Sequence, residues 1–556
     1  MFPQLWLTLI AAASVLGTQG RQLRKEDIRE RQVAAAQRWR TITGIEAAHA
    51  HSFPVKRASI KNITFSNPAA SQFYVDGTTI PEVDFDIGPS WSGLLPISSD
   101  PNETRKASTA MRSLIELFFW FFPPGPDGSL DDLIFWTNGG PGCSSLEGLL
   151  QENGACPFQW GYGQAKATVN EFSWTNLSSV LWVEQPVGTG FSQGEPNIKN
   201  EDDLAAQLVG FLQQFLEVFS ELKNKNLYLS GESYAGAYVP YIANFIYEHP
   251  TLVDLSLQGI WISDPSLSWD VVQEQIPAVD FVHKYEHVFA FNQSFMAQLD
   301  ALAAKCNYAG YFAKHVTYPP QGLLPLPGKS TSADPGCDAW DIIFEAALIV
   351  NPAFNIYRIF DTYPILWDVL GFPYVYKSFI CFCIHSLLLF RGSFEQVQVS
   401  PIYFDREDVK RAIHAPVNVT WTECSNINVF PRGDGSLPSA LSVLPNVIEK
   451  SNRTVIVHGL ADFILIAEGM TCELRTILLY FDHYTEIILG NGRQGFQTPI
   501  ANDSFIVDGV GALGNTHNER GLTYVEVQLS GHMVPQFSPV AAFQIMQYLM
   551  GMRATP

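Results

Sequence analysis

Short apolar runs that alternate with amphipathic stretches organise most of this chain. The runs are four to eight residues long and suit buried strands: residues 132–137, 179–183, 226–230, 259–263, 454–457 and 522–529. Apolar side chains recur at helical spacing in residues 200–220, 234–246 and 540–550. Because strands that alternate with helices form parallel sheets covered on both faces, this order predicts a mostly parallel α/β fold.

Two further segments carry weaker patterns. Residues 71–85 alternate loosely and are predicted to form strands, whereas the apolar and aromatic residues 114–122 suit either a buried strand or a core helix. The alternation stops after residue 264, in an aromatic and Pro-rich stretch with helical pieces at 271–302 and 338–348. We therefore expect residues 51–264 and 401–556 to form the two parts of one core, with residues 265–400 inserted as a lid.

Composition and charge exclude some classes of protein. The chain has 556 residues, 47% of them hydrophobic and 16% charged, which is typical of a globular protein with a large core. Its net charge of −21 would repel the phosphate backbone of DNA or RNA, so we expect no nucleic-acid partner.

The N-terminal residues indicate export. Residues 1–20 contain an apolar run that is too short to cross a bilayer and ends in small residues, as a secretory signal does, and we expect no integral membrane segment. Residues 21–50 follow as a basic arm or a pro-segment held against the acidic body. Secretion is expected, with a vacuolar lumen as the alternative. Seven glycosylation sequons support it: Asn62, Asn102, Asn176, Asn292, Asn418, Asn452 and Asn502.

Eight cysteines fit an oxidising compartment, and none has the spacing of a zinc site, so no metal is expected. They are Cys143, Cys156, Cys306, Cys337, Cys381, Cys383, Cys424 and Cys472. Cys381 and Cys383 lie in residues 378–390, a stretch that is apolar on all sides. That stretch suits a buried lid helix or non-native sequence from an unremoved intron.

Three residues with catalytic chemistry each follow a predicted strand. Ser233 stands in Gly-Glu-Ser-Tyr-Ala, a variant of the strand–turn–helix motif that exposes a serine hydroxyl. Asp462 and His532 follow the strands at 454–457 and 522–529. Since parallel strands end at one edge of a sheet, and the order Ser, Asp, His is that of α/β-hydrolases, the sequence predicts an α/β-hydrolase with a catalytic triad.

The chemistry of such a triad assigns a role to each group. His532 would remove the proton from Ser233, which attacks a carbonyl carbon, while Asp462 would orient the imidazole. The developing oxyanion would accept hydrogen bonds from backbone N–H groups of Tyr234 and of Gly140 in the Asn-Gly-Gly loop. That loop lacks the Lys-Ser/Thr pair of a phosphate-binding loop.

Five segments together resemble the serine carboxypeptidase family. They are WTNGGPGCSS (136–145), EQPVGTGFS (184–192), GESYAG (231–236), GLAD (459–462) and GHMVP (531–535). The resemblance implies a secreted or vacuolar peptidase that removes C-terminal residues from peptides through an acyl-enzyme, without a cofactor. It also implies that Asn138, Gly139, Glu152 and Glu232 bind the substrate's carboxylate, and that Cys143 pairs with Cys424 and Cys306 with Cys337.

Binding a carboxylate beside two glutamates requires protons between them, because close carboxyls raise each other's pKa. We therefore expect activity at acid pH. An acyltransferase or esterase on the same fold, or a catalytically silent relative, is the alternative; Asn138 favours the peptidase, since acyltransferase relatives tend to lose that residue.

Overall fold

The computed structural model describes residues 63–99, 115–154, 158–161, 164, 166–319, 324–351, 354–361, 368–370, 402–469, 496–500 and 503–556. Several predictions lie outside these residues: the signal peptide, the basic arm and the stretch 378–390. So do the sequons Asn62, Asn102 and Asn502, and Cys156, Cys381, Cys383 and Cys472.

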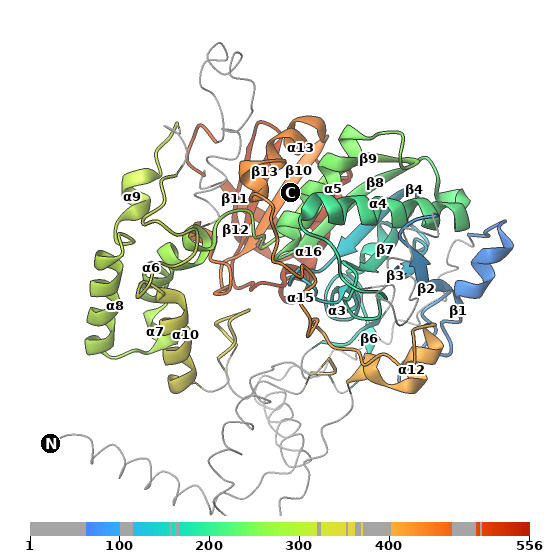
Figure 1. The fold of residues 1–556 in the computed structure, drawn as a ribbon, viewed down its shortest axis with the longest axis horizontal. Helices are drawn as coiled ribbons and strands as arrows, with labels where there is room; N and C mark the ends of the chain where they lie inside the picture. The colour runs from blue at the N-terminus through green and yellow to red at the C-terminus, as the bar shows by residue number, and fades with distance from the viewer. Residues whose placement is uncertain are drawn as a thin grey trace, which may run out of the picture. The chain divides into compact units, whose positions relative to one another are not determined.

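A single large sheet forms the centre of the fold (Figure 1). Within the described residues it has eleven strands, in the spatial order β1 (Tyr74–Val75), β2 (Ser90–Pro96), β3 (Glu116–Phe122), β7 (Ser178–Glu184), β4 (Ser129–Thr137), β8 (Lys225–Glu232), β9 (Leu255–Ser263), β10 (Arg453–Gly459), β13 (Leu522–Val527), β12 (Gly511–Glu519) and β11 (Asp503–Val507). The six strands from β7 to β13 run parallel, and they are the six apolar runs of the sequence. The flanking strands pair antiparallel. A small sheet pairs β5 (Phe158–Gln159) with β6 (Thr168–Val169).

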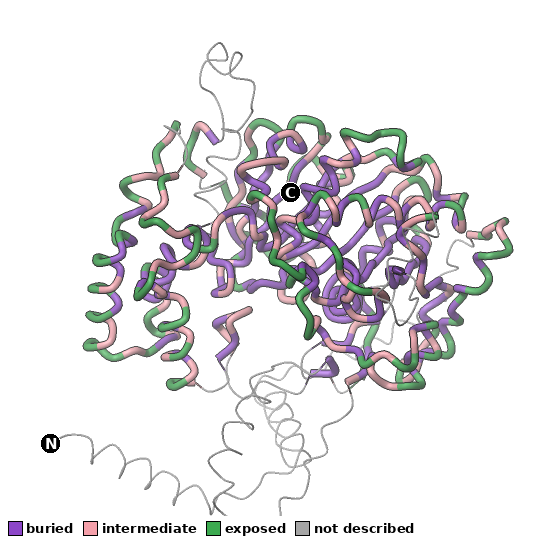
Figure 2. The backbone as a smooth tube through the Cα atoms, viewed as in Figure 1, coloured by how far each residue is buried: buried purple, intermediate pink, exposed green. Residues whose placement is uncertain are grey.

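The central strands are buried on both faces, which explains why they read as unbroken apolar runs. Side chains alternate between two cores: Phe135 of β4 and Leu229 of β8 point into one core, Trp136 and Tyr228 into the other. Figure 2 shows this buried centre. The first core is covered by α4 (Glu201–Val218), α5 (Ala235–Glu248) and α13 (Leu444–Lys450). The second is covered by α3 (Ser145–Gln151), α12 (Glu407–Ala412) and α16 (Pro539–Leu549).

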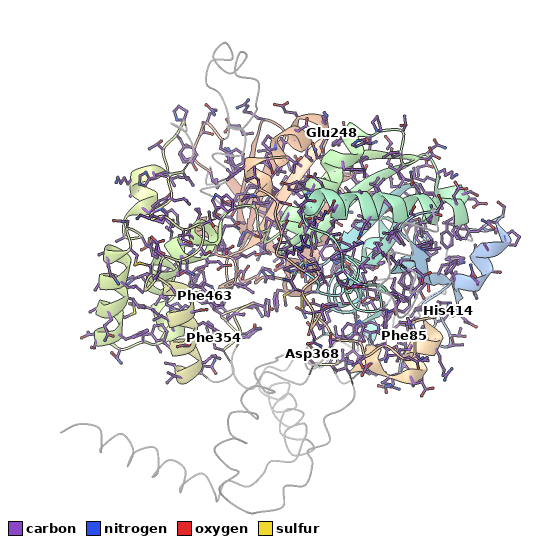
Figure 3. The ribbon with its side chains drawn as sticks, viewed as in Figure 1. Phe85, Glu248, Phe354, Asp368, His414 and Phe463 are labelled. Atoms are coloured by element: carbon purple, nitrogen blue, oxygen red, sulfur yellow. A yellow bond between two sulfur atoms is a disulfide. The ribbon has the colours of Figure 1, made fainter. Side chains whose placement is uncertain are left out.

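The first part of the segment between β9 and β10 builds most of a third apolar cluster. Its helices are α6 (Ile276–Lys284), α7 (Glu286–Phe289), α8 (Gln293–Lys305), α9 (Tyr311–His315) and α10 (Ala339–Val350), after a π-helical turn at Val271–Gln275. A disulfide joins Cys306 to Cys337 across it. Phe463, in the loop after β10, enters this cluster and packs against Phe354, with ring centroids 6.1 Å apart (Figure 3). The helical insertion is therefore attached to the loop that carries Asp462.

The remaining elements are short: α15 (Val534–Phe537) and 3-10 turns at Trp174–Asn176, Ser220–Leu222, Tyr403–Asp405 and Ser439–Leu441. None of the helices in the described part of the chain is both long enough and apolar enough to cross a membrane.

The prediction of strands at residues 71–85 was largely wrong, since only Tyr74–Val75 form a strand there. A 3-10 helix covers Pro68–Phe73, β1 has two residues, and turns follow. The Asn67 side chain caps this helix and Pro68 begins it, while Asp76 accepts hydrogen bonds from the backbone and hydroxyl of Thr78. These local side-chain bonds compete with a strand ladder and decide the backbone. At 114–122, where two readings were open, the structure has strand β3.

Close backbone packing at the end of β10 positions the loop that carries His532. A Cβ atom at Gly459 would collide with the carbonyl oxygen of Gly531 and lie 2.8 Å from that of Ser530.

We expect Gly459→Ala to displace residues 530–532, because both obstacles are backbone atoms. The free energy of unfolding should fall by about 1–3 kcal/mol, the usual cost of overpacking, and kcat/KM by about tenfold or more, since catalysis is sensitive to small displacements. Chemical denaturation and peptide-hydrolysis assays measure both. Gly161→Ala is the matched control, since its nearest neighbour would lie 3.8 Å away; an equal loss in both variants would contradict the argument.

Candidate active site

Ser233 sits in a strained turn between β8 and α5. Its φ of +60° lies in the left-handed region, which non-glycine residues adopt rarely. Two backbone hydrogen bonds hold the turn: Ser233 N–H donates to Ser263 at 3.0 Å, and Ser266 N–H donates to Ser233 at 2.9 Å. The end of β9 thus fixes the serine at the edge of the sheet.

His532 and Asp462 lie together at the same edge. His532 Nδ1 is 2.7 Å from Asp462 Oδ2, and both residues are buried. The other oxygen, Asp462 Oδ1, accepts N–H bonds from Ile464 at 2.8 Å and Leu465 at 3.3 Å. Ser233 and His532 line one pocket of about 270 Å³. The structure therefore brings the three residues predicted as a triad to one place.

The Asn-Gly-Gly loop lies against the turn of Ser233. A Cβ atom at Gly139 would collide with the backbone nitrogen of Tyr234 and lie 2.7 Å from the oxygen of Glu232, so only glycine permits this approach. Gly140 follows with a φ of +112° and lines the same pocket. The two predicted donors, Gly140 and Tyr234, thus belong to segments in direct backbone contact.

A disulfide and a buried carboxyl hold this loop in place. Cys143 is bonded to Cys424, and Ser144 N–H donates to the oxygen of Glu423 at 2.7 Å. Glu184 hydrogen-bonds the hydroxyl of Ser144 and accepts from the Trp421 indole at 3.2 Å. Burial raises the pKa of Glu184 to about 7. In the sequence Glu184 was only part of a motif; its partners come from distant segments.

Three carboxyl groups surround the side-chain amide of Asn138. Its Nδ2 lies 2.9 Å from Glu232, 3.2 Å from Glu147 and 3.3 Å from Glu152. The Trp136 indole donates to its Oδ1 at 2.8 Å, which fixes the orientation of the amide. Since an amide nitrogen carries two hydrogens, it cannot satisfy three carboxylates, and protons must lie among them.

Burial is the main cause of the raised pKa values in this cluster. It raises the pKa of Glu152 to about 7 and, with the neighbouring carboxylates, those of Glu147 and Glu232 well above their usual range. Asn138, Gly139, Glu147 and Glu232 line the pocket of Ser233, whereas Glu152 is buried and is not among the lining residues. Glu147 was not predicted, because a single glutamate in a helix looks like a solvated residue until its packing is known.

Two groups within the described residues bring three possible metal ligands within 4.8 Å of one another: Asp264 with Asp462 and His532, and Glu147 with Glu152 and Glu232. Hydrogen bonds already use the Asp462–His532 pair and all three glutamates. The chemistry below uses no metal.

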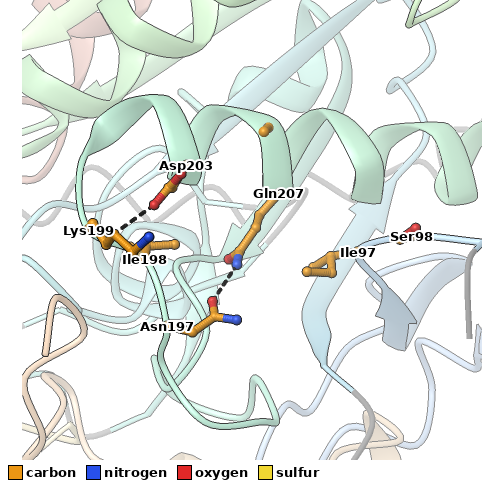
Figure 4. A pocket seen from close by; sticks show the side chains of 8 residues that line it. Ile97, Ser98, Asn197, Ile198, Lys199, Asp203 and Gln207 are labelled. Atoms are coloured by element: carbon orange, nitrogen blue, oxygen red, sulfur yellow. Dashed lines mark hydrogen bonds between the residues drawn. The ribbon is translucent and has the colours of Figure 1, made fainter. Parts of the chain in front are cut away.

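A larger hollow of about 350 Å³ lies elsewhere, beside the start of α4 (Figure 4). Gln207 bonds Asn197 at 2.8 Å there, and Lys199 N–H donates to Asp203 at 3.1 Å. Its lining contains neither a histidine nor a strained serine. That hollow therefore lacks the arrangement of serine and histidine found around Ser233.

Four predicted sequons lie in the described residues. Asn292, Asn418 and Asn452 are exposed, and Asn176 is half-buried. Glycosylation at these residues stays a prediction.

Comparison with known proteins gives the family. The family described as serine carboxypeptidase matches residues 109–551, which is most of the chain. The chain belongs to the serine carboxypeptidase family. A probable serine carboxypeptidase of Arthroderma benhamiae is 42% identical over 507 residues, covering 87% of each chain. Serine-type carboxypeptidase F of Aspergillus niger is 37% identical over 527 residues, covering 89% of this chain and 90% of the relative.

A solved structure supports the fold. Kex1(delta)p, a prohormone-processing carboxypeptidase from Saccharomyces cerevisiae, matches with a TM-score of 0.61 and 21% identity, covering 87% of this chain and 96% of the other. The α/β-hydrolase prediction is thereby confirmed. The chain is a serine-type carboxypeptidase, a hydrolase that acts on peptides, and the acyltransferase and silent alternatives are not favoured.

The carboxyl cluster predicts how substrate affinity of this serine carboxypeptidase depends on pH. If Glu152 and Glu232 bind the substrate carboxylate, as the sequence predicts, their protonated forms would donate to it and their ionised forms would repel it. We expect the KM for a blocked dipeptide to rise about tenfold for each pH unit above about 7, and to change far less in the double variant Glu152→Gln, Glu232→Gln. Steady-state kinetics from pH 5 to 8 measures both.

The C-terminal amide of the same dipeptide, used as a competitive inhibitor, is the control, because it lacks the carboxylate. Its inhibition constant should change little over this range. A double variant with the wild-type dependence of KM on pH would contradict the role of the glutamates.

The same buried carboxyls predict how stability depends on pH. A pKa that is raised by folding contributes stability below the unfolded value, and this contribution disappears as pH rises through the folded value. For Glu152 and Glu184, whose pKa values rise from 4.5 to about 7, the loss is about 3 kcal/mol each. We expect urea denaturation midpoints to be lower at pH 7.5 than at pH 4.5, and Glu184→Gln to reduce that difference. An equal or higher midpoint at pH 7.5 would show that folding does not raise the pKa values of these carboxyls.

Proposed function

We propose that Ser233, Asp462 and His532 form the catalytic triad of this carboxypeptidase. Ser233 Oγ attacks the carbonyl carbon of the last peptide bond while His532 removes its proton, and His532 then returns that proton to the leaving amine. Water then attacks the acyl-enzyme while His532 removes its proton, and His532 returns that proton to Ser233 Oγ as the acid product leaves. The hydrogen bond between His532 Nδ1 and Asp462 Oδ2 supports this assignment, because it presents the second ring nitrogen as the base.

We propose Gly140 and Tyr234 as the donors to the oxyanion. Tyr234 is followed at once by α5, whose first turn adds a positive electrostatic contribution at that point. The backbone of Gly139 packs against Tyr234, so the two donors belong to one rigid unit that needs no rearrangement during the reaction.

Restriction to the last residue of the peptide follows from the carboxyl cluster. In our proposal Asn138, Gly139, Glu152 and Glu232 bind the terminal carboxylate, with a glutamic-acid proton in place of the usual cation. The observation that carries the proposal is that Asn138 and Glu232 line the pocket of Ser233 and His532, which supports binding of the terminal carboxylate next to the scissile bond. Because the glutamates must be protonated, the enzyme should work best at acid pH.

Other parts of the chain are assigned in the same way. Ile464 lines the pocket and, with Tyr234, favours an apolar residue before the scissile bond. Residues 265–400 are proposed as the lid between two core parts, 51–264 and 401–556. Residues 1–20 are proposed as a signal that directs the protein to secretion, or to a vacuolar lumen, and residues 21–50 as an arm or pro-segment.

One set of substrates tests the reaction. At pH 4–6 we expect a blocked dipeptide with a free carboxylate to be hydrolysed at least about a hundredfold faster, in kcat/KM, than its C-terminal amide, because only the acid engages the cluster. A fluorophosphonate probe should label wild-type enzyme at Ser233. Ser233→Ala should abolish both labelling and hydrolysis. Its free energy of unfolding should stay within about 0.5 kcal/mol of wild type.

Other outcomes would reject parts of the proposal. Turnover of a simple ester with no preference for the free carboxylate would indicate an esterase. A folded protein without labelling or turnover would contradict the triad.

A further inference from the structure

Four neighbouring parallel strands end at the edge that holds the triad. In spatial order they are β8, β9, β10 and β13 (Figure 1). Ser233, Asp462 and His532 follow β8, β10 and β13. The residue that follows β9 is Asp264, which is fully buried, has a φ of +41°, and donates its backbone N–H to Val457 of β10 at 2.8 Å. A second aspartate is thus built into the centre of the site, and neither the triad nor the carboxylate cluster uses it.

The two aspartates are not equally supplied with hydrogen bonds. Asp462 accepts three: from His532 and from the backbone N–H groups of Ile464 and Leu465. Asp264 Oδ1 accepts one, from Gly459 N–H at 2.9 Å, with His458 Nε2 at 3.4 Å. Asp264 Oδ2 is buried and has no hydrogen-bond partner among the described residues. A buried carboxylate oxygen without a donor is costly, whereas a carboxylic acid at that position needs only an acceptor.

An acceptor lies nearby. Asp264, Asp462 and His532 each contribute an atom to a group in which all distances are within 4.8 Å. Since the three donors around Asp462 stabilise its charged form, the proton of such a pair belongs on Asp264.

The charges around the pair do not change this assignment. The titratable groups that act on the two aspartates are His458, His532, Glu152, Glu232, Glu274, Tyr357 and Tyr524. Burial lowers the pKa of His458, whose Nε2 is 2.7 Å from the oxygen of Leu465. Burial and the Asp462 carboxylate together raise the pKa of Asp264 well above its usual range.

We propose that Asp264 is a neutral carboxylic acid whose Oδ2–H donates to Asp462, and that it acts as a positioning residue for the triad. This hydrogen bond draws negative charge away from the carboxylate that faces His532. The imidazolium form of His532 is then less stabilised, and the ring remains available as a base at lower pH than it would beside an unshared carboxylate. The inference rests on the proposed triad and explains how a histidine base can serve an enzyme whose substrate pocket requires acid conditions.

Two variants of Asp264 test whether this residue carries a proton and donates it to Asp462. The variant Asp264→Asn places an N–H donor where the acid places its O–H. The acid limb, which is the pH range in which kcat/KM for the blocked dipeptide falls as His532 is protonated, should therefore stay within about 0.3 pH unit of wild type. The variant Asp264→Gly suits the positive φ and removes the donor. The acid limb should then move to higher pH by about half to one unit. Glu201→Gln, a buried acid-to-amide change at the start of α4, is the matched control and should leave the limb in place.

A charged Asp264 and an Asp264 with only a packing role would each give a different result. If Asp264 carries a charge, Asp264→Asn removes it and the limb moves to lower pH by about one unit; if Asp264 has only a packing role, neither variant moves the limb although stability falls. Either result overturns the proposal. Should Asp264→Gly not fold, the infrared difference between wild type and Asp264→Asn still decides: a carboxylic-acid carbonyl band must be lost in the variant at pH 6.

Fluorophosphonate labelling of each variant separates this inference from the triad assignment. Failure of wild-type enzyme to react at Ser233 would reject the triad itself. Labelling at Ser233 with an acid limb that ignores Asp264 would reject only the role of Asp264.

Discussion

The parallel pairing of β8, β9, β10 and β13 is the constraint on which the site depends. In parallel strands the carboxyl ends share an edge, so the segments that follow these strands meet there. Four side chains lie at this edge: Ser233, Asp264, Asp462 and His532. The backbone bonds from Ser233 to Ser263 and from Asp264 to Val457 continue the ladder past the strands. Precision at the site is therefore a property of the sheet rather than of the loops.

The second important feature of the site is a set of buried carboxyls that have no cation as a partner. Glu147, Glu152 and Glu232 share one amide, Glu184 ties the oxyanion loop to Trp421, and Asp264 faces Asp462. Each is tolerable only while protons are available, because a desolvated carboxylate is expensive and a desolvated acid is not. In our proposals, substrate binding, stability and the state of the histidine base thus respond to pH through one physical cause. This chemistry suits a carboxypeptidase of acidic surroundings, and the net charge of −21 agrees with it.

Sequence reasoning was strong where a local pattern has one physical meaning. The six apolar runs became the six parallel strands, since a strand buried on both faces has little alternative. It failed at residues 71–85, where Asn67 and Asp76 form local hydrogen bonds that favour turns. Strands β2, β11 and β12 were missed; β11 and β12 are only partly buried, so their apolar pattern is weak. Glu147 and Asp264 were missed because a carboxyl reveals its role only through its partners.

The sequence by itself determined the α/β class, the order Ser233, Asp462, His532 and the motifs of the serine carboxypeptidase family. Such information is local: it depends on the spacing of apolar side chains and on short runs of small residues. Only the tertiary structure decided which carboxyls share protons and which oxygen lacks a donor, because these depend on burial and on contacts between residues far apart in the chain. Asp264 and Asp462 are separated by 198 positions, and no periodicity in the chain records that they meet.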